Sequence, residues 1–388
     1  MANYITNREV KDRKEKAYID YSLIIIVAFL VGFGLIMIYS TTSYEAALSD
    51  KTNYDAAYYL KKQLRATAIG VVLLIVATFF KKEWIKKLSP LVYAAAAVMI
   101  ILVKTPLGVT VNGARRWLNF GIMTVQPAEI AKIAVILSVA YFMYQFEDKI
   151  RNTKAYWFTF ALPIPLMLLT LFLTDDLSSS VIIFCIGFAM LFVMSPDTKK
   201  TLLIALAGLA FITLVIFLVL KFPDFPLWGF RGERIKAWRN PEASLSDAAY
   251  QTSQGLYAIG SGGIFGKGIG QSIQKLGTLP EAQNDMVFAI VCEELGLFGG
   301  ICIIIMFGLL LWRMLVIASN AADLFGGMIV TGVMSHIAFQ VLLNIAVVTN
   351  VFPNTGISLP FISYGGSSVL VLLVEIGLVL NVCRDVKF

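Results

Sequence analysis

The chain has 388 residues, of which 58% are hydrophobic and only 15% charged, with a mean hydropathy of +0.77. This composition excludes an ordinary soluble domain, and the repeated apolar runs of about 17–25 residues can each cross a bilayer. Backbone groups in lipid must bond internally, so we expect helices rather than the short alternating strands of a barrel. The net charge of +7 is typical of basic cytoplasmic loops and does not indicate nucleic acid as a partner.

A mixed-charge tail at residues 1–19 precedes ten apolar runs, and we treat 1–388 as a single membrane domain. Pro163 and Pro165 should kink the fifth run. The predicted fold class is therefore an all-α integral membrane protein with about ten transmembrane helices. We place these helices at about 21–40, 66–80, 88–103, 128–146, 156–173, 180–194, 202–220, 285–311, 326–348 and 369–382.

The short loops between the runs are basic, whereas the long loops are rich in glycine. The positive-inside rule therefore predicts that the short loops and both termini are cytoplasmic. The long segments 104–127, 221–284 and 350–368 then face outward, and the largest of them, 221–284, joins the seventh and eighth helices. The 350–368 segment is too apolar for an exposed loop and too rich in Pro and Gly for a helix. We expect it to be broken backbone packed within the protein.

Asp285 stands where the 221–284 loop meets the eighth run, and Glu281 precedes it by four residues. A carboxylate at this boundary is costly unless it is solvated, paired or used in chemistry. If a helix begins near Pro280, both carboxylates share one face. Helix capping by the acid is the alternative, and the local sequence does not separate the two explanations. His336, the only histidine, lies inside the ninth run, where we expect it to bond between helices, so an outer-face base must be a carboxylate.

A second group of charges on the predicted outer face consists of Arg115 and Arg116, in the 104–127 segment, and Glu129 and Lys132, in the first turn of the fourth run. Glu129 and Lys132 are three residues apart and can neutralise each other. Arginine matches phosphate oxygens, so Arg115 and Arg116 suit the head group of a phosphate-bearing lipid. Arg234 extends this idea into the large loop, with a solvated loop face as the alternative.

Two further acids, Glu293 and Glu294, lie about two turns into the eighth run, where charge is expensive. We expect them in a polar contact between helices or facing a cytoplasmic half-cavity, rather than in catalysis.

The segment Pro353–Ser368 closely resembles the signature of the SEDS family, the RodA/FtsW/SpoVE proteins of bacterial growth, division and sporulation. The resemblance covers nearly the whole chain and is closer to the FtsW-like branch. The sequence departs from the family at Gln283-Asn284, where His-Thr is common, and at Asp175–Ser178, where Pro-Asp-Leu-Gly is usual. Further matching stretches are Asn112–Trp117, Gln126–Lys132, Tyr257–Gly263 and Leu279–Ala282.

The resemblance implies a peptidoglycan glycosyltransferase of the bacterial cytoplasmic membrane, acting in cell division or elongation. It would polymerise lipid II onto nascent lipid-linked glycan and release undecaprenyl diphosphate, with Asp285 as the essential acid. A divalent cation, Mg²⁺ or Mn²⁺, is expected without assigned ligands, and no organic cofactor is expected. The implied partner is a class B penicillin-binding protein, a transpeptidase. The expected substrate-binding residues are Arg115, Arg116, Glu129, Lys132, Glu281, Arg234, Ser363 and Tyr364.

Two other functions remain open at this point. One is a lipid II flippase, which would need a polar path through the whole bilayer. The other is a non-catalytic scaffold that recruits the transpeptidase. A solute transporter is a more distant alternative, because the chain shows no convincing internal repeat.

Overall fold

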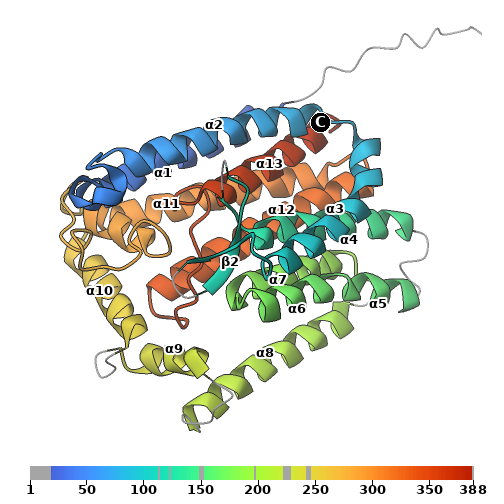
Figure 1. The fold of residues 1–388 in the computed structure, drawn as a ribbon. Coiled ribbons are helices and arrows are strands. Elements are labelled where there is room, and N and C mark those ends of the chain that lie inside the picture. The colour runs from blue at the N-terminus through green and yellow to red at the C-terminus, as the bar shows by residue number, and fades with distance from the viewer. Residues whose placement is uncertain are drawn as a thin grey trace, which may run out of the picture.

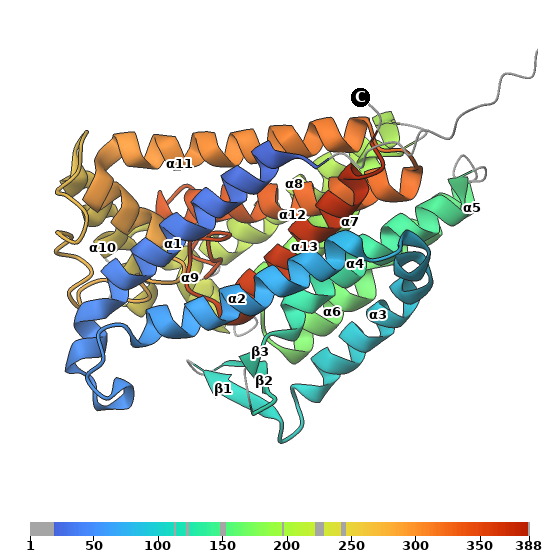
Figure 2. The ribbon, with the colours of Figure 1, turned by 90° about the horizontal axis from the view of Figure 1, so that it is seen from above.

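The computed structural model describes residues 19–111, 114–121, 124–147, 153–195, 198–221, 229–241 and 246–386. The predicted tail at 1–19 lies almost wholly outside these residues, as do Asn112-Gly113 and two parts of the 221–284 loop. The described part is an elongated bundle of helices with one small sheet beside it (Figures 1 and 2).

Within the described residues, eight segments are long and apolar enough to cross a membrane: α1, α2, α3, α4, α5 with α6, α11, α12 and α13. α7 is apolar but shorter, with 17 residues. The protein is therefore a multi-pass helical membrane protein, while a total of ten spans stays a prediction. The bounds are α1 Tyr21–Leu48, α2 Tyr58–Phe79, α3 Lys82–Leu102, α4 Pro127–Gln145, α5 Thr153–Ala161, α6 Pro163–Leu173, α7 Leu177–Val193, α8 Thr198–Lys221, α9 Gly229–Arg239, α10 Asp247–Gly262, α11 Val287–Ser319, α12 Leu324–Val348 and α13 Gly366–Cys383, with a short 3-10 turn η1 at Asp50–Thr52.

Two of the apolar segments are interrupted. The predicted kink in the fifth run is confirmed, because α5 ends at Ala161 and α6 begins at Pro163. The second break, inside α11 at Gly296, was not predicted. Gly296 has φ 70° and ψ −170°, which is far from helical. Glycine is required at this position because another part of the backbone comes close: a β-carbon there would lie 2.3 Å from the carbonyl oxygen of Ile264.

A three-stranded antiparallel sheet lies in the segment that we expected to be an irregular loop. Its strands are β1 Gly108–Val111, β2 Ala114–Asn119 and β3 Thr124–Val125, in the order β1-β2-β3. Leu118 of β2 is fully buried, so one side of the sheet packs on the bundle. The strands are too short for a recognisable alternating pattern, which explains why the sequence did not reveal them.

The predicted large loop is partly helical, because α9 and α10 lie within it. Ser246 caps α10 by accepting a hydrogen bond from the backbone N–H of Ala249. α10 packs against α11, which brings residues of the large loop next to Asp285.

The centre of the bundle is formed by α4, α12 and α13, most of whose residues are buried. α13 lies along α2 in both views (Figures 1 and 2). There the side-chain amide of Asn381 donates to the carbonyls of Ala77, Thr78 and Phe80 at the end of α2. These donors satisfy carbonyls that a helix end leaves without partners.

Candidate active site

Asp285 lies in a turn rather than in a helix. α11 begins at Val287, and its N-cap, Met286, makes no side-chain capping bond. Glu281 has φ 55°, in the left-handed region. The expectation that Glu281 and Asp285 share one helical face is therefore wrong, because no helix starts at Pro280. Capping of α11 does not explain Asp285 either.

Three elements converge on Asp285, which is 7% exposed. Its Oδ1 accepts a hydrogen bond from Nε2 of Gln251 on α10, at 3.1 Å. Its backbone carbonyl accepts one from Nδ2 of Asn344 on α12, at 2.8 Å. The same Asn344 nitrogen donates to the carbonyl of Ile357, at 2.7 Å. Asn344 therefore binds the turn of Asp285 to the segment that follows α12.

That segment, residues 350–365, is non-helical and largely buried, as expected from its sequence. Ser363 Oγ donates to the carbonyl of Asn284, at 2.6 Å, and the N–H of Tyr364 donates to the carbonyl of Gln283, at 2.8 Å. Both residues therefore contact the chain immediately before Asp285.

The environment of Asp285 raises its pKa from 3.8 to about 7. Burial is the main cause, and the negative charge of Glu281 adds to it. A hydrogen bond from the backbone of Asp285 itself, the charge of Arg234 and the hydrogen bond from Gln251 act in the opposite direction, in that order. A carboxyl group with this pKa can both accept and release a proton near neutral pH, which suits a general base.

Two of the predicted arginines, Arg234 and Arg116, are linked to Asp285 by their charges: Arg234 acts on Asp285, and Arg116 acts on Arg234. Arg234 donates from Nη1 to the carbonyl of Asn354, at 3.1 Å. Burial lowers the pKa of Arg234, and the charges of Asp285, Arg116 and Asp176 also act on it. Arg116 donates to backbone carbonyls of the turn between α6 and α7, at 3.1 and 2.7 Å. A backbone contact therefore holds the positive charge of Arg234 where it acts on the carboxylate, and the charge of Arg116 acts on Arg234.

Arg115, Glu129 and Lys132 have other partners. The guanidinium of Arg115 donates to carbonyls at the end of α3 and the start of β1, so it attaches the sheet to the bundle. Glu129 and Lys132 form the expected ion pair at 2.8 Å, with side chains 6% and 2% exposed. Among the described residues, no hydrogen bond or ion pair joins any of these three to Asp285.

The Glu129–Lys132 pair belongs to a buried polar network under the 350–365 segment. Lys132 Nζ donates to Oε1 of Gln340, at 3.2 Å, and Nε2 of Gln340 donates to the carbonyl of Ser358, at 3.0 Å. His336 lies 2.8 Å from Gln340 Oε1 and 2.8 Å from a carboxylate oxygen of Glu375 on α13. The prediction that His336 bonds between helices is confirmed.

Glu293 and Glu294 bind the chain between α10 and Asp285, residues 263–279. Lys267 contacts Glu293 and Lys275 contacts Glu294, each at 2.7 Å. Glu294 also accepts from Ser40 of α1, at 2.7 Å, so the predicted contact between helices exists. The lysine partners were not predicted, and the alternative of a cytoplasmic half-cavity is wrong.

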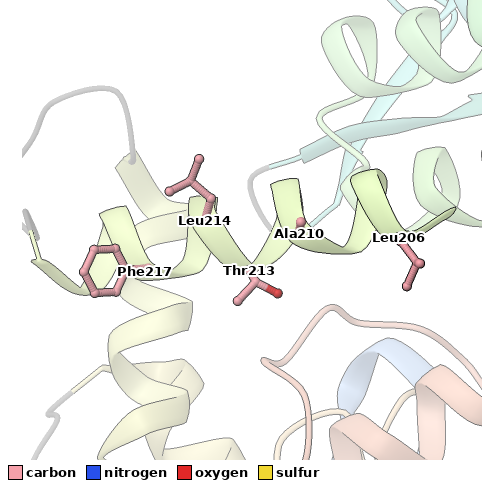
Figure 3. Close-up of a pocket in the computed structure, with 5 residues that line it drawn as sticks. All are labelled: Leu206, Ala210, Thr213, Leu214 and Phe217. Atoms are coloured by element: carbon pink, nitrogen blue, oxygen red, sulfur yellow. The ribbon is translucent and has the colours of Figure 1, made fainter. Parts of the chain in front are cut away.

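In the described ranges, no group of three or more His, Cys, Asp or Glu side chains could by itself hold a metal ion. A depression of about 540 Å³ lies along α8 (Figure 3). It contains no titratable side chain, so the chemistry is better placed at the turn of Asp285. The depression is lined by Leu206, Ala210, Thr213, Leu214 and Phe217.

Sequence reasoning missed Gln251, Asn344 and Asn354. Gln251 and Asn344 belong to no motif, and Asn354 lies in the Pro353–Ser368 signature without a role assigned to it. Only the folded arrangement shows that Gln251 and Asn344 contact Asp285 and that Asn354 contacts Gln251.

Comparison with known proteins places this arrangement in a family. A family model described as "Cell cycle protein", for FtsW, RodA and SpoVE, matches residues 21–387. "Stage V sporulation protein E" of Bacillus subtilis is 37% identical over 376 residues, which cover 95% of this chain and 98% of that protein. "Probable peptidoglycan glycosyltransferase FtsW" of Trichlorobacter lovleyi is 34% identical over 369 residues, with 95% and 94% covered.

Two solved structures share the fold. One is described as "Structural coordination of polymerization and crosslinking by a peptidoglycan synthase complex" and matches with a TM-score of 0.76 at 27% identity, covering 95% of this chain and 98% of that one. The rod shape determining protein RodA of Thermus thermophilus matches with a TM-score of 0.68 at 26% identity, with 95% and 98% covered. Since the family model and these relatives match almost from end to end, the chain belongs to the FtsW/RodA/SpoVE family, the SEDS family of membrane proteins.

Proposed function

We propose that this protein is a peptidoglycan glycosyltransferase that polymerises lipid II at the outer face of the bacterial cytoplasmic membrane, with Asp285 as the general base. The observation that carries the proposal is a buried carboxyl group with a pKa of about 7, on which the charge of Arg234 acts, with Arg116 in turn acting on Arg234. Family membership and the name of the Trichlorobacter relative support the reaction class.

In the proposed reaction, Asp285 removes the proton from the 4-hydroxyl of the acceptor sugar. The hydroxyl oxygen then forms a bond to the anomeric carbon of the donor sugar. The bond between that carbon and the diphosphate oxygen breaks, and undecaprenyl diphosphate leaves with the electron pair. Arg234 and Arg116 stabilise the negative charge that develops on the leaving group.

A divalent cation is also part of the proposal. Glu281 and Asp285 supply only two carboxylates, too few for a metal site built from protein alone. Mg²⁺ commonly keeps several waters and binds one or two carboxylates together with substrate phosphates. Glu281 is suited to such a role, because Asp285 must stay available for the proton. The cation would supply charge neutralisation on the diphosphate.

For the partner we propose a class B penicillin-binding protein. Support comes from the similar solved structure, whose description names a complex that coordinates polymerization and crosslinking. The similarity to FtsW and to Stage V sporulation protein E favours a role in division or sporulation over elongation.

The test is polymerisation of purified lipid II by purified protein in detergent, with and without the transpeptidase and EDTA. Asp285→Asn and Asp285→Ala should abolish glycan synthesis while the variants keep wild-type thermal unfolding or better. The matched control is Asp247→Asn, an exposed carboxylate at the start of α10, which should stay active. Near-normal synthesis by either Asp285 variant would refute the assignment. Because micelles have no second side, polymer formation in detergent would also exclude a protein that only flips lipid.

A further inference from the structure

A line of three hydrogen bonds ends on the carboxylate of Asp285. The backbone N–H of Gly356 donates to Oδ1 of Asn354, at 3.1 Å. Nδ2 of Asn354 donates to Oε1 of Gln251, at 2.8 Å. Nε2 of Gln251 donates to Oδ1 of Asp285, at 3.1 Å. The line joins the 350–365 segment to α10 and to the turn before α11.

The direction of this line is set at its first member. A backbone N–H can only donate, so the oxygen of the Asn354 amide must face Gly356. Its NH₂ group then faces Gln251, which turns the oxygen of Gln251 toward Asn354 and its own NH₂ group toward Asp285. The carbonyl of Pro280 also accepts a hydrogen bond from Nε2 of Gln251, at 3.3 Å. Each amide is therefore oriented by its neighbours.

We infer that Gln251 is a positioning residue that holds Oδ1 of Asp285 and leaves Oδ2 as the oxygen that accepts the proton. This inference rests on the proposed function of Asp285. Oδ2 faces Gly356, where a β-carbon would lie 3.9 Å away. Gly356 also has φ 74°, a conformation that L side chains rarely adopt. The glycine therefore leaves space on the side of Oδ2.

The other groups around Asp285 differ in kind from this donor. The backbone N–H of Asp285 itself also lowers the pKa of the carboxyl group, but it is fixed in the chain. The charged groups that act on Asp285 are Glu281 of the same turn and Arg234 of α9. From α12, Asn344 binds the backbone carbonyl rather than the carboxylate. Burial raises the pKa of Tyr364, in the adjoining segment, to about 12, so this residue is neutral at working pH. Within the described part of the chain, Gln251 supplies a neutral side-chain donor to the carboxylate, and this bond favours the ionised form.

The first test is the pH dependence of lipid II polymerisation. Asp285 acts as a base only when ionised, so activity should rise with pH through about 7. Gln251→Leu removes the donor and should move this midpoint upward by about one pH unit, with little change in KM. Gln251→Glu keeps the shape but adds negative charge, so its shift should be larger. Gln271→Leu, an exposed glutamine in the 263–279 segment, is the matched control and should keep the wild-type profile.

A second variant tests the orientation without touching either residue of the final bond. Asn354→Asp removes the NH₂ donor, so the amide of Gln251 should turn over and present its oxygen to Asp285. This variant should shift the midpoint in the same direction as Gln251→Leu. Because its new carboxylate also adds negative charge near Asp285, the shift should be larger, as for Gln251→Glu. Asn354→Asp also keeps the inference testable if Gln251→Leu fails to fold.

The inference is overturned if these variants keep the wild-type midpoint, or if they lose activity equally at every pH. In both cases the activity of Asp285→Asn shows whether the role of Gln251 or the role of Asp285 as base has failed. If Asp285→Asn is inactive, only the role of Gln251 fails, whereas an active Asp285→Asn removes the proposed function itself.

Discussion

The ion pair between Lys275 and Glu294 allows a sharp test of what holds the 263–279 segment on the bundle. The two atoms are 2.7 Å apart, and the side chains are only 5% and 0% exposed. Lys275→Met leaves the carboxylate of Glu294 buried, with the hydroxyl of Ser40 as its remaining partner. Breaking one side of such a pair costs about 3–5 kcal/mol, because a buried charge loses its compensation.

The assay is the free energy of unfolding of the purified protein in micelles, from a denaturant titration. Lys61→Met is the matched control, because Lys61 and Asp55 are also 2.7 Å apart but 59% and 36% exposed. This control should cost less than about 1 kcal/mol. The double variant Lys275→Met with Glu294→Leu should recover most of the loss, since both charges are removed together. Equal losses for Lys275→Met and Lys61→Met would refute the reasoning from burial.

Three further predictions concern the site and its supports. The raised pKa of Asp285 means that the folded state favours the neutral acid, so this contribution to stability is present below about pH 4 and is lost as pH rises through about 7. The free energy of unfolding, measured at these two pH values, should therefore include a difference of up to ~4 kcal/mol that Asp285→Asn lacks. An identical pH dependence in both proteins would contradict this. Gly296→Ala should destabilise the protein and abolish synthesis, because its β-carbon would meet the carbonyl of Ile264 at 2.3 Å. The control is Gly308→Ala in the same helix, whose β-carbon meets nothing within 4 Å. The control should be tolerated in thermal unfolding and polymerisation assays. Asn344→Ala should leave the carbonyls of Asp285 and Ile357 without this donor and cost about 1–3 kcal/mol, with a loss of kcat; wild-type kcat would show that the turn needs no such support.

Much of the fold followed from apolar run lengths, because lipid leaves a backbone few options other than helices. The break before Pro163 was predictable for the same kind of reason, since proline cannot continue a helix hydrogen-bond pattern. The break at Gly296 was not predictable, because glycine is common in membrane helices. The need for glycine there comes from a close approach of residues 264–266, which are distant in the sequence.

Some residues of the candidate site were likewise predictable from the sequence, and others were not. The importance of Asp285 could be argued from charge at a lipid boundary, and Ser363 and Tyr364 from the family signature. The structure shows that burial, rather than a shared helical face with Glu281, makes Asp285 unusual. The roles of Gln251 and Asn344 depend on contacts between distant segments, for which a single sequence contains no signal.

The 350–365 segment has a consequence for how the protein is made. Its backbone has no regular secondary structure of its own and is held by amides of α12, such as Asn344 and Gln340, and by the turn before α11. A ribosome delivers this segment after all of those partners, just ahead of α13, which then docks along α2, synthesised long before. The contacts that hold the turn of Asp285 are therefore completed only once the last part of the chain has been synthesised.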